Sequence, residues 1–366
     1  LKTGVRTVTA VAAPAVSVAY STLDQAVEAA RAAQVKWSAL PMERRKEIIS
    51  EMRVVLRRHV EELSKLAVEE TGLGRYADKL SKNRLVIDKT PGPEYLEATA
   101  FTGDDGLALI EYAPYGVIGS ITPTTNPSET VINNGIGMLS AGNSVVFNPH
   151  PSSKRVSTRA MEIMDQVIVA HGGPRGCLTT VSEPTIDTAQ ALMKHPGIRL
   201  LVVTGGPAVV KAAMASGKKV IGAGPGNPPV VVDETADLDQ AAVGIVQGAS
   251  LDNNIVCIAE KEIIAVDSIA DELKRKLQKN GGYLLSPHQV RQLEKVVLDD
   301  PAKPKYPAKN FVCKDASVIL AAIGVQADKD TRIAFCEVEE NHPFVQVELL
   351  MPLIPLVRVR NVDEAI

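Results

Sequence analysis

Between residues 116 and 215 the sequence alternates short apolar segments with longer amphipathic ones. The apolar segments have the length and composition of strands: residues 116–121, 144–148, 178–181 and 200–203. Each is followed by a segment with helical spacing: residues 129–139, 153–170, 186–193 and 208–215. Strands that alternate with helices pair in parallel, and the helices cover both faces of their sheet. This alternation predicts an α/β fold whose ligands bind at the carboxyl ends of the strands.

A second set of strands and helices follows residue 228. Its segments with helical spacing are residues 238–251 and 269–279, and its strand-like segments are residues 230–232, 261–266, 333–338 and 353–359. A chain of 366 residues suits two domains. We therefore expect one domain over residues 21–227 and another over 228–366. Residues 1–20 lack helical spacing and predict an extended or mobile arm.

Helices are predicted ahead of the alternating region. One begins at Thr22, a second carries the apolar residues between Ile48 and Leu63, and a third spans residues 76–89. The turn signal Gly103-Asp104-Asp105-Gly106 separates two short apolar segments and predicts a hairpin over residues 100–113. Such an arm could join subunits.

Composition narrows the possible ligands. The net charge is −3, and the charged residues form no long basic run, which argues against nucleic-acid and membrane-surface binding. The four cysteines are far apart and lack CxxC spacing, so neither a metal site nor a disulfide framework is predicted. No apolar stretch is long enough to span a membrane. We expect a cytoplasmic protein that acts on small molecules.

Cys257 follows the polar pair Asn253-Asn254 and precedes an apolar strand-like segment. A thiol at a turn can be approached by a substrate, and this position makes Cys257 a candidate nucleophile. The alternative is a small buried apolar residue, which is the common role of free cysteines.

Three loops of the first domain are candidate ligand sites. Thr204-Gly205-Gly206-Pro207 joins a strand to a helix, where free N–H groups can face a phosphate or a nicotinamide, although such Gly pairs can also be purely structural. Gly222-Ala223-Gly224-Pro225-Gly226 precedes a strand, so it is not a dinucleotide fingerprint. Asn148-Pro149-His150-Pro151 ends a strand and precedes a helix. The alternative to a ligand site here is a rigid turn that only joins the two elements.

Taken together, these phrases resemble the aldehyde dehydrogenase superfamily, and more narrowly its CoA-acylating branch of microcompartment-associated propionaldehyde and acetaldehyde dehydrogenases. The resemblance runs from about Thr22 to the last residue. It is carried by residues 121–130, 132–143, 148–151, 204–207, 222–229 and 256–261. It implies a Rossmann-type domain that binds NAD and coenzyme A, followed by an α/β catalytic domain.

The resemblance implies that Cys257 attacks an aldehyde, that a hydride passes to NAD, and that the resulting thioester is transferred to coenzyme A. It places the backbone N–H of Cys257 and the side chain of Asn126 at the oxyanion, although Asn126 could instead be a turn former. Hydrolytic relatives carry this Asn one place earlier, where Thr125 stands. Their general base, a Glu, corresponds to Gly222, which favours a thiol acceptor over water.

The resemblance also implies which residues line the cofactor site. They come from the strand ends and from a later segment of the second domain: Thr122, Pro123, Thr124, Asn148, Pro149, His150, Thr204, Gly205, Gly206, Gly224, Glu348 and Leu350. Asn148 stands where hydrolytic relatives have a Lys on the adenosine ribose, which leaves NAD or NADP open. Glu348 is expected at the nicotinamide ribose, unless it is a solvated charge.

The final phrase, residues 361–366, reads as the start of a helix, and we expect a further C-terminal part to follow it. The expected partners are an aldehyde, a second copy of the chain and, in a bacterial microcompartment, shell or cargo proteins. Two rival functions remain: a hydrolytic aldehyde dehydrogenase, and a catalytically silent structural or cargo protein that keeps only the nucleotide-binding fold.

Overall fold

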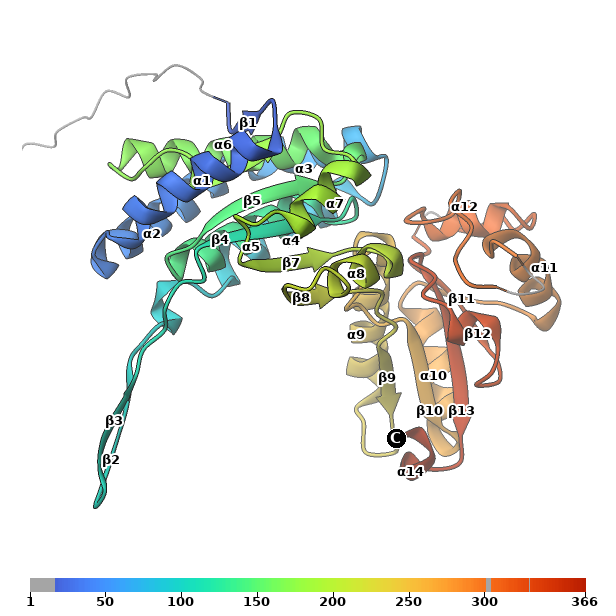
Figure 1. Cartoon of the computed structure of the whole chain (residues 1–366). Coiled ribbons are helices and arrows are strands. Elements are labelled where there is room, and N and C mark those ends of the chain that lie inside the picture. The colour runs from blue at the N-terminus through green and yellow to red at the C-terminus, as the bar shows by residue number, and fades with distance from the viewer. Residues whose placement is uncertain (1–16, 301–303, 329) are drawn as a thin grey trace, which may run out of the picture.

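The computed structural model describes residues 17–300, 304–328 and 330–366. Its framework is two sheets (Figure 1). The first contains β1 (Ala19–Tyr20), β4 (Val117–Thr122), β5 (Ser144–Pro149), β6 (Leu178–Val181), β7 (Leu200–Thr204) and β8 (Lys219–Ala223), in the order β1-β6-β5-β4-β7-β8. The second contains β9 (Pro229–Val232), β10 (Glu262–Val266), β11 (Gly282–Leu284), β12 (Ile333–Glu337) and β13 (Leu353–Val359), in the order β11-β12-β13-β10-β9. The strand pairs of both sheets are parallel, which confirms the predicted α/β class.

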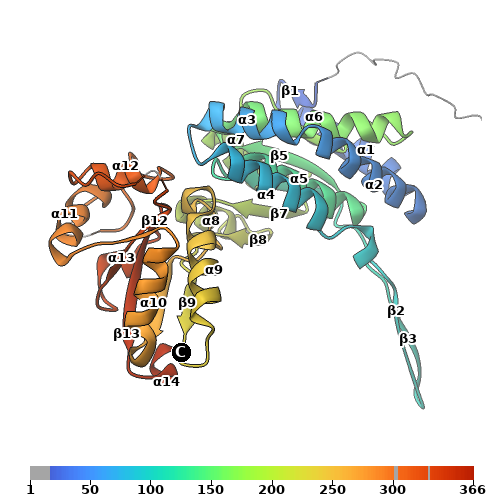
Figure 2. The ribbon, with the colours of Figure 1, turned by 180° about the vertical axis from the view of Figure 1, so that it is seen from behind.

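Helices cover both faces of the first sheet (Figures 1 and 2). They are α1 (Leu23–Ser38), α5 (Pro127–Ser140), α6 (Lys154–Ala170), α7 (Ile186–Lys194) and α8 (Pro207–Met214). Successive side chains of β5 enter opposite cores: Val145 and Phe147 pack with α5 and α6, whereas Val146 packs with α1 and α7. A strand buried on both faces explains the continuous apolar run in its sequence.

Three more helices pack outside α5 and α6: α2 (Met42–Arg58), α3 (Val60–Thr71) and α4 (Tyr76–Lys89). The bounds of α4 are the predicted ones. The prediction of one helix through Ile48 and Leu63 is wrong, because His59 (φ −102°, ψ 5°) separates α2 from α3.

The start of the chain also differs from the prediction. Ala19–Tyr20 is an edge strand rather than part of an arm, because Thr180 N donates to Val18 O at 3.0 Å and the two strands pair in parallel. The remainder of the predicted arm, residues 1–16, lies outside the described residues.

The second sheet has two cores. α9 (Leu238–Ser250) and α10 (Asp267–Lys279) pack over Ile263 and Phe335. The shorter helices α11 (Pro287–Val297), α12 (Ala316–Ala321) and α13 (Pro343–Gln346) belong to the core around Ala334 and Cys336. The chain then ends in α14 (Val362–Ala365), whose first turn is capped by Asn361 as its sequence predicts. The chain passes from one sheet to the other between Ala223 and Pro229.

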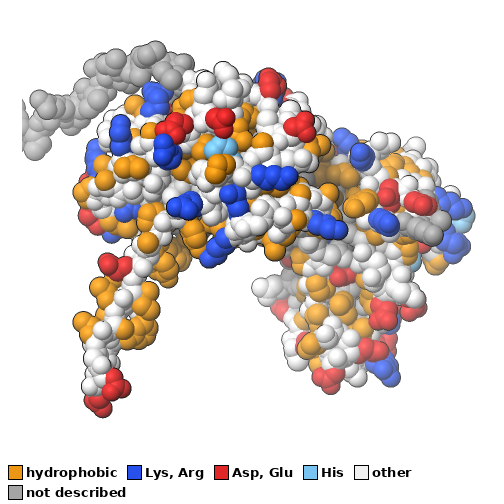
Figure 3. Space-filling view, in the orientation of Figure 1, with side chains coloured by type: hydrophobic (Ala, Val, Ile, Leu, Met, Phe, Trp, Pro, Cys, Tyr) orange, Lys and Arg blue, Asp and Glu red, His pale blue; other side chains and the backbone are white. Residues whose placement is uncertain are grey.

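A two-stranded antiparallel hairpin projects away from the first sheet and its helices (Figures 1 and 2). It consists of β2 (Thr99–Gly103) and β3 (Gly106–Ile110), where a hairpin was predicted over residues 100–113, and every residue of both strands is exposed. Apolar side chains run along it (Figure 3), among them Phe101, Leu107 and Leu109. The described residues also contain two short 3₁₀ helices, η1 (Pro93–Tyr95) and η2 (Pro151–Ser153), and a tight turn, η3 (Leu251–Asn254), in which residues 252–254 are left-handed. Within the described residues, no helix has the length and apolar character needed to cross a membrane.

Candidate active site

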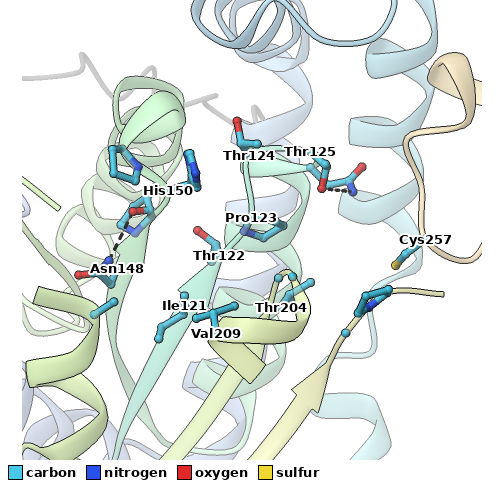
Figure 4. Close-up of a pocket in the computed structure, with 18 of the residues that line it drawn as sticks. Ile121, Thr122, Pro123, Thr124, Thr125, Asn148, His150, Thr204, Val209 and Cys257 are labelled. Carbon is cyan, nitrogen blue, oxygen red and sulfur yellow. Dashed lines mark hydrogen bonds between the residues drawn. The ribbon is translucent and has the colours of Figure 1, made fainter. Parts of the chain in front are cut away.

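A cavity of about 460 Å³ lies where the carboxyl ends of β4, β5 and β7 meet the segment that carries Cys257 (Figure 4). This is the edge at which parallel sheets bind ligands, and the volume falls within the range of about 300–1,000 Å³ typical of small-molecule sites. Segments that belong to both sheets line it, including Glu348 and Leu350 from the segment before β13.

The turn before Cys257 is held in an unusual conformation. Asp252, Asn253 and Asn254 have φ values of 50°, 57° and 61°, in the left-handed region that Asp and Asn tolerate better than most residues. All three side chains are buried. Such a conformation persists only where surrounding contacts enforce it.

Side-chain hydrogen bonds enforce this turn. Asn253 Nδ2 donates to Cys313 O at 2.9 Å, and Asn254 Nδ2 donates to Glu260 O at 2.9 Å. Lys261, itself 4% exposed, donates from Nζ to Asn254 O at 2.7 Å. The turn is thus fixed on both sides of Cys257, and the thiol is presented at a defined place on the cavity wall.

Among the four cysteines, Cys257 alone is not buried. Burial raises the pKa of Cys313 and of Cys336 to about 12, and it raises the pKa of Cys177 as well. These three thiols therefore remain protonated and inaccessible at neutral pH. Cys257 lines the cavity and is the only one of the four that a substrate can reach.

Asn126 lines the same cavity and precedes α5. Its Oδ1 accepts a hydrogen bond from Lys82 Nζ at 2.6 Å, and its Nδ2 donates to Thr125 Oγ1 at 3.2 Å. These contacts orient the carboxamide with its oxygen toward α4. The remaining N–H of Nδ2 is the group that can stabilise negative charge on a bound substrate.

A buried charge cluster lies behind Asn126. Lys79 Nζ of α4 donates to Asp252 Oδ2 at 2.9 Å, and Lys82 Nζ forms ion pairs with Asp252 Oδ2 at 2.6 Å and with Glu129 Oε1 at 3.3 Å. Burial opposes the charge on Lys82, but Glu129 and Asp252 together raise its pKa. The same lysines lower the pKa of Asp252 against the effect of burial. The cluster connects α4, which packs beside α5, to the turn that precedes Cys257.

Several polar atoms on the cavity wall have no protein partner. Thr122 Oγ1, Thr124 Oγ1 and Glu348 Oε1 are buried and unpaired within the described part of the chain. Burial raises the pKa of Glu348, while nearby Lys261 and the N–H of Gly226 act in the opposite direction. Buried polar atoms are normally hydrogen-bonded, so these three indicate where a polar ligand would bind.

The amino end of α8 also faces the cavity. Thr204 ends β7, Gly205 and Gly206 join it to this helix, and a Cβ at Gly206 would meet nothing within 4 Å. A ligand can therefore approach the backbone there closely.

The family is decided by comparison with known proteins. The model of the aldehyde dehydrogenase family matches residues 8–284 of this chain. An acetylating acetaldehyde dehydrogenase of Salmonella typhimurium is 51% identical over 351 residues, which cover 95% of this chain and 74% of the relative. The chain belongs to the aldehyde dehydrogenase family.

Two further comparisons place this aldehyde dehydrogenase more narrowly. A CoA-propanoylating propanal dehydrogenase of Salmonella typhimurium is 44% identical, over 95% of this chain and 74% of its own length. The crystal structure of a propionaldehyde dehydrogenase from Rhodopseudomonas palustris, solved with bound CoA and an acylated cysteine, matches with a TM-score of 0.90 at 50% identity and covers 96% of this chain and 80% of that one. These comparisons confirm the predicted resemblance to the CoA-acylating branch.

The site residues expected from the sequence of this aldehyde dehydrogenase all lie on one cavity. They are Cys257, Asn126, Thr122, Pro123, Thr124, Asn148, Pro149, His150, Thr204, Gly205, Gly206, Gly224, Glu348 and Leu350. Their roles remain predictions. Asn148 was expected to line the cofactor site, but its side-chain oxygen is already occupied. Asn148 Oδ1 accepts a hydrogen bond from Thr188 Oγ1 at 2.7 Å, so the side chain holds α7 in place.

Sequence reasoning missed other residues of the site. Thr185, Ile186 and Ala189 line the cavity from the start of α7, which was predicted only as a packing helix. Lys79 and Lys82 were missed because a lysine on a helix is normally solvated. No local signal in the sequence indicates that Asp252 faces them.

Proposed function

We propose that this aldehyde dehydrogenase oxidises a short-chain aldehyde with NAD and transfers the acyl group to coenzyme A. The observation that carries the proposal is Cys257, the one cysteine of the four that is accessible, on a cavity to which the loop from Gly222 to Gly226 contributes no carboxylate. Relatives named for acetylating and CoA-propanoylating activity support the same reaction.

The proposed reaction begins at Cys257. Its thiolate adds to the aldehyde carbonyl and forms a thiohemiacetal, whose oxyanion accepts hydrogen bonds from Asn126 Nδ2 and from the backbone N–H of Cys257. Loss of hydride from the former aldehyde carbon leaves a thioester on Sγ. Cys257 then passes its acyl group to the thiol of coenzyme A and is regenerated.

The cavity fits a nicotinamide cofactor. Its unpaired acceptors Thr122 Oγ1 and Glu348 Oε1 can bind hydroxyl groups, and the open backbone at Gly206 can lie against a flat ring. When bound there, NAD would accept the hydride. His150, which the cavity also includes, has a pKa lowered by burial and would contact a phosphate as a neutral donor.

The acyl acceptor, a thiol or water, depends on whether the cavity has a carboxylate that can act as a general base for water. Among the described residues that line the cavity, Glu348 is the only carboxylate. Gly222, at the position of the hydrolytic general base, has no side chain to activate water. Coenzyme A needs less activation, because a thiol near its ordinary pKa is already a few per cent thiolate at neutral pH.

A product assay tests the proposal. The protein is incubated with propanal and NAD, with and without coenzyme A, and both NADH and the acyl products are measured. We expect sustained NADH formation and propionyl-CoA only when coenzyme A is present. Free propionate formed at the same rate without coenzyme A would show hydrolysis instead and would overturn the proposal.

We further propose that the hairpin of β2 and β3 packs against a second copy of the chain. A two-stranded hairpin alone in water is marginally stable, and this one exposes Phe101 by 58% and Leu107 by 71%. Replacing both by Ser should shift the protein toward monomer in analytical ultracentrifugation.

A related structure comes from a bacterial microcompartment, and co-fractionation with shell proteins would test that location for this chain.

A further inference from the structure

Lys82 is buried at the meeting point of three segments of the molecule. Its side chain is 7% exposed, and its ammonium group contacts Asn126 Oδ1 at 2.6 Å, Asp252 Oδ2 at 2.6 Å and Glu129 Oε1 at 3.3 Å. The contact with Asn126 is a hydrogen bond, and the contacts with the two carboxylates are ion pairs. Lys82 is thus fixed in position and points one donor at the candidate oxyanion group.

The contact with Asn126 determines which end of the carboxamide faces the substrate. A free carboxamide can rotate by half a turn and exchange its oxygen with its nitrogen at little cost. If it did so, the oxygen would face the developing negative charge and repel it. A cation on Oδ1 prevents the exchange, because the rotated amide would place its NH₂ group against the ammonium of Lys82.

The cation also strengthens the donor. Hydrogen bonds in a chain polarise one another, and a charged donor on the carbonyl oxygen draws electron density from the amide nitrogen. The two carboxylates around Lys82 keep it charged in a site from which water is excluded. The effect on Asn126 is therefore constant across the pH range in which the enzyme would work.

We infer that Lys82 is a positioning residue that orients and polarises the Asn126 carboxamide as the oxyanion donor for the reaction of Cys257. This inference rests on the proposed function. It adds to the proposed reaction a residue that does not line the cavity. Lys82 does not touch the substrate; it acts through Asn126. Because it also binds Asp252, it holds the donor and the nucleophile-bearing turn at a fixed separation.

The test is a double-mutant cycle between Lys82→Met and Asn126→Ala, assayed by steady-state kinetics with propanal, NAD and coenzyme A. Removing an oxyanion donor typically lowers kcat by about 10²–10³, and we expect Lys82→Met to lower kcat at least about tenfold with little change in KM. The variant with both changes should be no slower than Asn126→Ala alone. Losses that multiply in the double variant, or an unchanged kcat in Lys82→Met, would overturn the inference.

Two further measurements separate positioning from a general structural role. The rate of Cys257 alkylation by iodoacetamide should fall no further in Lys82→Met than in Lys79→Met, because each change removes one cation from Asp252 in the turn before Cys257. Lys79→Met removes the neighbouring cation from Asp252 together with its long contact to Thr125 O, and it keeps Lys82 on Asn126, so it measures the loss that does not pass through the Lys82–Asn126 contact. The amount by which kcat falls further in Lys82→Met than in Lys79→Met is then the contribution that Lys82 makes through Asn126. Equal losses of kcat in the two variants would contradict the inference.

Lys82→Met leaves a buried Glu129 without its cation and could prevent folding. The double variant Lys82→Met/Glu129→Gln removes one cation and one anion and leaves the Lys79–Asp252 pair intact. Its kcat should be at least about tenfold below that of Glu129→Gln alone. Failure of the wild type to form propionyl-CoA would defeat the proposed function, whereas equal kcat values in these two variants would defeat only the inference about Lys82.

Discussion

Gly226 packs directly against the backbone carbonyl of Cys257. A Cβ at Gly226 would lie 2.2 Å from the carbonyl oxygen of Cys257 and 3.2 Å from its carbonyl carbon. The loop from Gly222 to Gly226 therefore fixes the position of the Cys257 backbone, and only glycine allows this approach.

We predict that Gly226→Ala lowers kcat by about 100-fold, because the added methyl group forces the Cys257 backbone to move and a displacement of about 1 Å can cost that much. The measurement is steady-state kinetics, together with a urea unfolding curve that confirms the variant is folded. Gly244→Ala is the matched control: it lies in α9, where a Cβ would meet nothing within 4 Å. Equal activities of Gly226→Ala and the control would contradict the prediction.

Cys257 should be the only thiol that reacts. At pH 8, a short treatment of the folded protein with iodoacetamide should add one group, which peptide mass spectrometry would locate on Cys257, since Cys177, Cys313 and Cys336 are buried and have raised pKa values. Alkylated protein and Cys257→Ala should both retain less than about 10⁻³ of the wild-type rate, as expected on loss of a nucleophile. Full activity after complete labelling would exclude Cys257 as the nucleophile and would leave the catalytically silent alternative in place.

The cofactor preference should be NAD over NADP by at least about tenfold in kcat/KM. No Lys or Arg is among the described residues that line the cavity, and His150 has a lowered pKa, so an added 2′-phosphate would lack a cation to neutralise it. Initial rates with each cofactor at fixed propanal and coenzyme A measure the ratio.

A substitution at the rim of the cavity tests the cause of that preference. Ile186 lines the cavity and is 74% exposed, and Ile186→Arg should move the ratio toward NADP. Leu85→Arg adds the same charge to a residue outside the cavity that is 58% exposed, and it should leave the ratio unchanged. An equal response to both substitutions would mean that net charge, and not the site, sets the preference.

The sequence predicted the parts of this structure that follow local patterns. The strands β6 and β13 and the helix α4 have their predicted bounds, because apolar periodicity and flanking Gly or Pro residues define them locally. The edge strand β8 was missed: it begins with Lys219 and is mostly exposed, so it lacks an apolar run.

The hydrogen-bond and ion-pair partners of the site residues could not be predicted from the sequence, because they come from segments far away along the chain. Lys79 and Asp252 are 173 residues apart, and neither neighbourhood indicates a buried ion pair. The resemblance placed Asn148 on the cavity correctly, but only the fold reveals that Thr188 occupies its side-chain oxygen. The identity of a site residue could thus be predicted from motifs, whereas its hydrogen-bond partners could not.

Lys261 provides a prediction about pH. Burial lowers the pKa of its ammonium group to about 8, although Glu348, Cys313, Cys257 and Glu260 act in the opposite direction. In the unfolded chain a Lys titrates near about 10.4. Below pH 8 both states carry the proton, and between pH 8 and about 10.4 only the unfolded state does. Stability must then rise with pH in this window, by up to about 1.4 kcal/mol per pH unit from this one group.

The measurement is the free energy of unfolding in urea, followed by circular dichroism, for the wild type and for Lys261→Met between pH 7 and pH 10. The variant loses the hydrogen bonds from Nζ to Asn254, so it should be less stable at every pH. The difference between the two proteins should nevertheless be constant up to about pH 8 and grow above it. A difference that stayed flat to pH 10 would show that Lys261 keeps its proton in the folded state, and that its contacts with Asn254 and the nearby Glu348 outweigh its burial.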